Sequence, residues 1–384
     1  MSASDDVGIV GIGIHPFGRH PGVAGLEMAA VAVRASLADA GVRWADVDFA
    51  AGGSDAAGNA DTSVASLGLT GIPFINVRNG CATGGSALIT AHSMLCSGAA
   101  QLAVVVGFDK HPPGAFNPLP EEWGLGSWYG ETGLMLTTQF FALKIQRYMN
   151  EHGITPSTLA KVAAKAFRNG ARNPNAWRRR PLSEEEILSS RMVNHPLTQY
   201  MLCSPGEGAV ALVLARGRRL REAARPPVYL RSVVFRTRRF GSFEVFSPAI
   251  PIESAPSSTA EAAVAAFEQA GIGPEDVDIA QLQDTESGAE VMHLAETGLC
   301  QHGEQESLIQ SGATEVGGRL PINTDGGCLA NGEPIGASGL RQVHEIVAQL
   351  RGEAGVRQAP GPRRVGFTQV YGAPGVSACA VLSR

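Results

Sequence analysis

Two side chains that could carry out chemistry lie in glycine-rich stretches of this 384-residue chain. Cys81 lies in NGCATGGSAL, a glycine turn that runs into an alanine-rich helical stretch. A helix N-terminus favours the thiolate form of cysteine, which is the form that attacks acyl groups. Glu333 lies in NTDGGCLANGEPIGASG, between a glycine and a proline, and a carboxylate can accept a proton from a carbon acid or a hydroxyl. The two stretches therefore suggest covalent or acid–base chemistry at an acyl group.

Both residues also have a structural interpretation. Cys81 could be a small buried residue that fills a tight turn. Glu333 could be an acid at a helix start, where the helix dipole stabilises it. An ionised carboxylate cannot donate a hydrogen bond and would repel a thiolate, so a catalytic Glu333 requires burial to raise its pKa.

The elements that would position these side chains repeat along the chain. Residues 29–50, AAVAVRASLADAGVRWADVDFA, return as residues 259–280, TAEAAVAAFEQAGIGPEDVDIA, in the same register. Each copy predicts an alanine-rich helix with a glycine C-cap, at Gly41 and Gly271, followed by a turn and a buried strand.

A second pair of similar segments closes each half. SPGEGAVALVL from Ser204 matches APGVSACAVL from Ala373, and both predict a strand after a tight turn. Between the repeats, each half holds a glycine-rich turn that leads into a helix and then an apolar strand. Alternating helices and continuously apolar strands predict an α/β protein whose sheets are covered by helices on both sides.

The repeats divide the chain into two halves. We expect residues 1–111 and 201–216 to form the N-terminal half and residues 228–384 the C-terminal half, joined by a linker at 217–227. Residues 112–200 have no counterpart in the second half and are predicted to be an inserted loop region over the site. Insertions of this length are usually lids or binding surfaces.

Composition narrows the classes of function. A net charge of -5 and 17% charged residues do not favour nucleic acid as a partner. The sequence shows no apolar stretch long enough for a membrane span, and its acidic start does not have the form of a signal peptide. The six cysteines form no CxxC pair, so we predict neither a metal site nor disulfides, and a cytoplasmic location.

With these motifs in this order, the whole chain resembles the thiolase superfamily, and within it the branch of lipid-transfer or sterol-carrier-protein-type thiolases. The resemblance implies the thiolase fold: two duplicated halves, each with a mixed five-stranded sheet, in αβαβα layers.

The family's site residues carry over only in part. Cys81 matches the nucleophilic cysteine, but Glu333 stands at the position of the family histidine, and Tyr371 at that of the second cysteine. Gln283, in QDTE, stands where the family has Asn or His and could hold a donor or water. The resemblance also implies an oxyanion hole made by the backbone N–H groups of Cys81 and Ala373.

Other residues are weaker candidates. His111 and His195 could supply the missing imidazole. Asp284 is a carboxylate that lies near the site by its motif position. Three aromatic residues of the inserted region could line the substrate pocket: Trp123, Trp128 and Tyr129.

The leading functional hypothesis is an acyl-CoA enzyme that makes or breaks a carbon–carbon bond next to a thioester, by thiolase-like acyl transfer through Cys81. One alternative is a retro-aldolase acting on a bulky, steroid-like β-hydroxyacyl-CoA without a covalent intermediate. Another is a non-catalytic subunit that binds lipid or acyl-CoA. We expect coenzyme A to be a substrate or part of the substrate, and we expect no covalently bound cofactor. The resemblance further implies a homodimer or higher oligomer and an accessory protein with an OB fold and a zinc ribbon.

Overall fold

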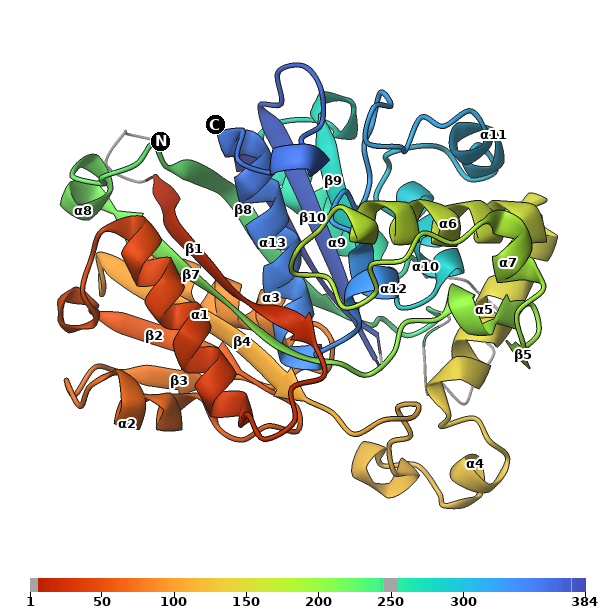
Figure 1. The fold of residues 1–384 in the computed structure, drawn as a ribbon, viewed down its shortest axis with the longest axis horizontal. Coiled ribbons are helices and arrows are strands. Elements are labelled where there is room, and N and C mark those ends of the chain that lie inside the picture. Colours follow the sequence, from red (N-terminus) through yellow and green to blue (C-terminus); the bar gives the residue numbers. More distant parts are fainter. Residues whose placement is uncertain (1–5, 243, 245–254, 374) are drawn as a thin grey trace.

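One mixed sheet runs through both halves of the chain in this computed structural model, which describes residues 6–242, 244, 255–373 and 375–384 (Figure 1). Within these residues the strand order is β3-β2-β4-β7-β1-β8-β11-β10-β9. The strands are β1 (Val7–Gly18), β2 (Phe49–Gly53), β3 (Phe74–Asn76), β4 (Leu102–Lys110), β7 (Glu207–Arg216), β8 (Val228–Thr237), β9 (Ile279–Leu282), β10 (Val365–Gly372) and β11 (Val376–Ser383).

The sheet is the sum of two related units. The first half supplies the five strands from β3 to β1, as predicted. In the described part of the second half, β8, β11, β10 and β9 pair in that order, and Ile322 forms a parallel bridge to Ala280 of β9 where a fifth strand would lie. The two units are joined through two residue pairs between β1 and β8, Gly8 with Tyr229 and Ile9 with Val228. The predicted duplication is therefore confirmed, with the two sheets continuous at one edge.

The internal repeat has the predicted structure in both copies. Helix α1 (Gly25–Ala40) and helix α9 (Ser258–Ala270) each end at a left-handed glycine, Gly41 and Gly271, both with φ of 69°. A short turn then leads into β2 in the first half and β9 in the second. Glycine suits these positions because a side chain would strain the left-handed backbone.

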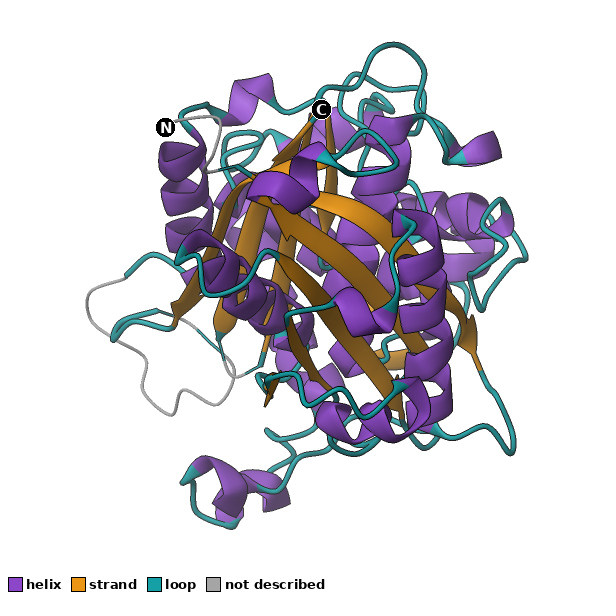
Figure 2. Ribbon diagram, turned by 90° about the vertical axis from the view of Figure 1, so that its left-hand side faces the viewer, coloured by secondary structure: helices purple, strands orange, loops and turns teal. Residues whose placement is uncertain are grey.

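Helices form layers on both sides of the strands (Figure 2). α3 (Thr83–Cys96) and α13 (Ile335–Arg351) lie in the middle and share one apolar core with strands of both halves. These two helices approach closely, since a Cβ at Gly84 would lie 2.9 Å from the backbone N of Leu340. On the outer faces, α1 packs against β2, β4 and β7, and α9 packs with α10 (Ser287–Glu296) against the second half. The predicted αβαβα layering follows from these contacts.

The segment predicted to be an inserted loop region is largely helical. It contains α4 (Trp128–Glu131), α5 (Thr137–His152), α6 (Pro156–Ala171), α7 (Glu184–Leu188) and the hairpin β5 (Met192–Asn194) and β6 (Leu197–Thr198). Although it precedes β7 in the chain, α6 packs into the core of the second half (Figure 1). The exact boundaries of the halves remain a prediction.

The remaining helices are short. They are α2 (Val64–Leu67), α8 (Gly217–Arg221), α11 (Gln305–Gln310) and α12 (Gly327–Asn331). No helix in the described part of the chain is both long and apolar enough to cross a membrane.

Candidate active site

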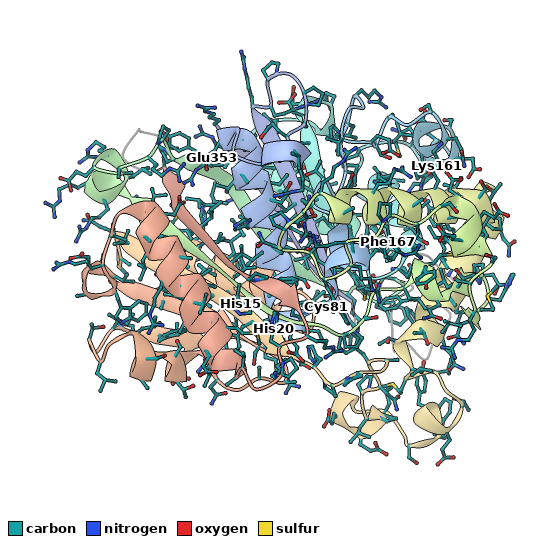
Figure 3. All side chains as sticks on the ribbon, in the orientation of Figure 1. His15, His20, Cys81, Lys161, Phe167 and Glu353 are labelled. Atoms are coloured by element: carbon teal, nitrogen blue, oxygen red, sulfur yellow. The ribbon has the colours of Figure 1, made fainter. Side chains whose placement is uncertain are left out.

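Cys81 lies in a tight turn immediately before α3, near the centre of the molecule (Figure 3). The turn is closed by Thr83, whose hydroxyl donates to the carbonyl of Gly80 at 2.7 Å and accepts from the N–H of Asn79 at 2.9 Å. Gly80 has a positive φ of 53°. The side chain of Cys81 is therefore held by a rigid turn at the start of a helix.

The turn after β10 touches the Cys81 turn. A Cβ at Gly80 would lie 2.9 Å from the carbonyl O of Ala373, and a Cβ at Gly372 would lie 2.8 Å from the backbone N of Ala82. Only glycine permits this approach at either position. The structure thus brings together the two segments whose backbone N–H groups are the expected oxyanion hole.

Glu333 reaches the same place from the second half. Its backbone is tied to the first half, because its N–H donates to the carbonyl of Ser204 at 2.8 Å and its carbonyl accepts from the N–H of Gly206 at 3.2 Å. Its side chain is fully buried, and Oε1 accepts a hydrogen bond from Nε2 of Gln283 at 3.0 Å. The Glu333 carboxyl also interacts with the Cys81 thiol, so Cys81, Glu333 and Gln283 lie close together.

The sequence-based expectation for the charge on Cys81 is wrong. Burial, followed by the neighbouring Glu333, raises the pKa of the Cys81 thiol well above its ordinary value. The helix N-terminus is not sufficient to stabilise the thiolate. Burial also raises the pKa of Glu333, and the thiol of Cys328, the positive charge of Arg341 and the thiol of Cys81 only partly oppose that shift. The pair thus tends to retain its protons.

Two further cysteines face Glu333 and were missed from the sequence. Burial and then Glu333 raise the pKa values of Cys203 and Cys328 well above the ordinary range. Cys203 precedes Ser204, and Cys328 lies in the motif that contains Glu333. Their closeness to these segments in the sequence was the only available signal.

Tyr371 lies near the end of β10, in a buried environment that differs from that of Cys81. Its hydroxyl donates to Oε2 of Glu244 at 2.7 Å. Nζ of Lys144 lies 4.9 Å from the centroid of its ring, and the ring of His293 lies 5.9 Å away. These three neighbours could not be predicted from the sequence, because they come from separate segments without a recognisable motif.

Asp284 and His111 support the segments that carry the site. Asp284 accepts a hydrogen bond at 2.6 Å from the N–H of Cys328 at the start of α12, and burial raises its pKa well above the ordinary value. Nε2 of His111 accepts from the N–H of Ile335 at 3.4 Å, at the start of α13. Both side chains thus contact the ends of helices that flank Glu333.

The other candidates have different surroundings. His195 is exposed in the β5–β6 hairpin. Tyr129 is buried in an apolar cluster with Met135, Phe140 and Tyr371, whereas Trp128 is 55% exposed. The side chain of Trp123 lies outside the described part of the structure.

Several buried polar atoms at the site have open hydrogen-bonding capacity. In the described part of the chain no partner is found for Oε1 of Gln283, Oε1 of Glu286 or Oγ of Ser287. Leaving such atoms unpaired is costly, so they suit polar groups of a substrate or water. Burial raises the pKa of Glu286 to about 8, which makes its carboxyl a donor near neutral pH. Within the same residues, no group of three or more His, Cys, Asp or Glu side chains is arranged to hold a metal ion.

Comparison with known proteins identifies the class. Residues 7–180 match the family model described as thiolase, N-terminal domain, and residues 252–384 match the model described as thiolase C-terminal domain-like. The chain belongs to the thiolase family, and the fold and the class of enzyme predicted from the sequence are confirmed.

Its relatives specify the branch. The chain is 32% identical over 372 residues to sterol carrier protein 2 from Gallus gallus, covering 93% of this chain and 68% of that protein. It is 31% identical over 383 residues to the benzoylsuccinyl-CoA thiolase subunit BbsB from Thauera aromatica, covering 97% of this chain and 96% of that one. Among solved structures, the Ltp2-ChsH2(DUF35) aldolase superimposes with a TM-score of 0.89 at 26% identity, over 100% of this chain and 99% of the other. The predicted sterol-carrier-type branch is thus confirmed.

Proposed function

We propose that the protein cleaves the bond between Cα and Cβ of a β-hydroxyacyl-CoA by a retro-aldol reaction. The observation that carries this proposal is the pairing of Tyr371 with Glu244, which supplies a proton acceptor where the family has a cysteine. The high pKa of the Cys81 thiol and the replacement of the family histidine by Glu333 argue against a thiolate nucleophile. The similarity to an aldolase over the whole chain supports the same choice.

The proposed reaction needs one base, one acid and one oxyanion site. Tyr371 takes the proton of the substrate β-hydroxyl, the bond between Cα and Cβ breaks, and Cβ becomes a carbonyl carbon. The electron pair of the broken bond moves to the thioester as an enolate, held by the backbone N–H groups of Cys81 and Ala373. Glu333, whose pKa is raised by burial, then donates its proton to Cα and takes up a proton from water after the products leave. The products are an aldehyde or ketone and a shortened acyl-CoA.

The apolar surroundings of Tyr371 favour a substrate whose acyl group is apolar. Tyr129, Met135 and Phe140 pack in one buried cluster with Tyr371, and Leu125 and Leu134 lie against this cluster. Such a wall would favour a bulky hydrocarbon acyl group, including a steroid-like side chain.

The test compares turnover with and without free CoA. Purified protein and a β-hydroxyacyl-CoA should give the shortened acyl-CoA at the same rate in both conditions, and Tyr371→Phe should lower kcat by about 10²-fold or more, the usual contribution of a positioned base. Tyr229→Phe is the matched control, because it removes a phenol on β8 that has no role in the proposed reaction and should leave the rate within about twofold. Products that form only when CoA is added would reject the retro-aldol reaction.

Acyl transfer through Cys81 is the second candidate. Two contacts favour it: the Cys81 thiol interacts with Glu333, which could accept the thiol proton during attack, and the turn that holds Cys81 touches the Ala373 turn. Incubation with a β-ketoacyl-CoA and CoA should then leave an acyl adduct on Cys81 that mass spectrometry detects. Full activity of Cys81→Ala without an adduct would exclude this route. Steady turnover by either route, lost in Glu333→Gln, would exclude a non-catalytic lipid-binding role.

We further propose that the chain acts in the cytoplasm as a homodimer or higher oligomer together with an accessory protein. β3 is an edge strand of the sheet. Ile75 within it is 43% exposed and Leu69, which precedes it, is 84% exposed, which suits pairing with a second copy. The aldolase that resembles this chain is named for two components, Ltp2 and ChsH2(DUF35), which supports an accessory protein. Native mass spectrometry of protein purified from its host would detect both assemblies, and a monomer without bound protein would contradict them.

A further inference from the structure

Tyr371 is held by a lysine and a glutamate from two other segments. Oε2 of Glu244, in the segment after β8, accepts the hydrogen bond from the Tyr371 hydroxyl. Nζ of Lys144, on α5, lies 3.6 Å from the same oxygen and 4.9 Å from the centroid of the Tyr371 ring. The side chain of Lys144 is 11% exposed and that of Glu244 is 0% exposed, so little water screens these interactions.

A comparison within the molecule shows what is unusual about this pair. Lys165 of α6 and Glu290 of α10 also form a buried ion pair, and there both carboxylate oxygens are occupied, one by Lys165 and the other by Nδ2 of Asn323. Such a fully satisfied pair is a structural feature. In contrast, Oε1 of Glu244 has no hydrogen-bond partner in the described part of the chain. A carboxylate that binds a phenol and keeps an open oxygen has the capacity to receive a proton.

Other charged groups around Tyr371 keep the lysine ionised. His293, whose ring faces Tyr371, contacts Oε2 of Glu296 through Nδ1 at 2.7 Å. Burial opposes ionisation of Glu296, but Lys144 and His293 outweigh it and lower the pKa of Glu296 to about 2. Burial likewise lowers the pKa of Lys144, yet Glu244 and Glu296 more than offset it, so the net shift is upward. Lys144 therefore remains a cation beside the phenol over the whole working pH range.

We propose that Glu244 and Lys144 are positioning residues that prepare Tyr371 for proton transfer. When Tyr371 accepts the substrate hydroxyl proton, its own proton passes to Oε2 of Glu244. The O–H bonds of the substrate and of Tyr371 break, and new O–H bonds form on Tyr371 and on Glu244. The ammonium of Lys144 stabilises negative charge on whichever of the two oxygens carries it. After product release, Glu244 loses its proton to water. This inference rests on the proposed role of Tyr371 in the retro-aldol reaction.

The first experiment measures ionisation of Tyr371 and does not depend on activity. The ultraviolet absorbance of tyrosinate is followed against pH, with the same titration of Tyr371→Phe subtracted to isolate this residue. Lys144→Met should move the titration to higher pH, because a cation is lost beside the phenolate. Glu244→Gln should move it to lower pH, because an anion is lost. If neither variant shifts the titration, the two charges do not act on the phenol and cannot prepare it for proton transfer.

The second experiment measures kcat and KM for cleavage of the β-hydroxyacyl-CoA as a function of pH. Glu244→Gln and Lys144→Met should each lower kcat by about 10²-fold with KM changed little, whereas Lys144→Arg should restore most of the rate. Arg147→Met is the matched control on α5: it removes an exposed cation paired with Glu151 and should have no effect.

The outcomes separate this inference from the proposed function. Opposed titration shifts without any cleavage activity in the parent protein would reject the retro-aldol function but keep the pairing of Tyr371 with Lys144 and Glu244. Cleavage that needs Tyr371 but is unaffected by Glu244→Gln and Lys144→Met would reject the positioning role alone. If Lys144→Met fails to fold, Lys144→Gln and the titration of Glu244→Gln decide the question, and an unshifted titration in either overturns the inference.

Discussion

The contact between Glu333 and Cys81 predicts that Glu333→Gln makes Cys81 more reactive. A negative charge about 4 Å from a thiolate costs roughly 4 kcal/mol at an effective dielectric constant of about 20. The glutamine keeps the shape of the side chain and removes that charge. Because burial raises the pKa of Glu333, the carboxyl is protonated part of the time and the full cost is an upper limit. A thiolate of lower pKa is also a weaker nucleophile, so the alkylation rate should rise about 3–30-fold.

Iodoacetamide alkylation near pH 8, followed by peptide mass spectrometry, measures the rate at Cys81 in both proteins. Cys96 is exposed on α3 and provides an internal control, since its rate should not change unless the fold has loosened. An unchanged or slower rate at Cys81, with Cys96 unaffected, would refute the conclusion that Glu333 suppresses the thiolate.

Two further predictions concern stability. A Cβ at Gly107 of β4 would lie 2.0 Å from the carbonyl O of Gly336 at the start of α13. Gly107→Ala should therefore lower the free energy of unfolding, measured by urea titration, by about 1–3 kcal/mol. Gly317→Ala is the control: its added Cβ meets open space and should change that free energy by less than about 0.5 kcal/mol. The pKa of Glu286 is raised by burial to about 8, so its protonated form stabilises the fold at low pH and that stability is lost as pH rises from roughly 5 to 8, by about 1.4 kcal/mol per pH unit. Glu286→Gln lacks this group. As pH rises over the same range, its free energy of unfolding should therefore fall less than that of the parent protein. Curves of unfolding free energy against pH that run parallel for the two proteins would contradict a raised pKa at Glu286.

Local patterns were sufficient to predict the repeated units. The glycine caps at Gly41 and Gly271 are backbone requirements, and they fixed where each helix ends and each strand begins. The glycine-rich turns around Cys81 and Glu333 were also informative, because close approach of backbone segments can be inferred from residues that lack a Cβ.

Interactions between distant segments could not be predicted in the same way. Lys144 appears in the sequence as an ordinary charge on an amphipathic helix, and its contact with Glu244 depends on how α5 packs on the second half. The direction of the Cys81 pKa shift could not be predicted for the same reason, because it also depends on tertiary packing. It is set by burial and by Glu333, whose distance from Cys81 is a property of the tertiary structure.

The backbone of Glu333 donates a hydrogen bond to Ser204 and accepts one from Gly206, which ties the acid of one half to the segment just before β7 of the other. Neither half alone therefore contains a complete set of reactive groups, and α8 (Gly217–Arg221) joins the halves at the surface, where a break would disturb few packed side chains. A polypeptide divided there would regain its chemistry only by reassociation, which makes this architecture a natural basis for a split reporter of fragment assembly.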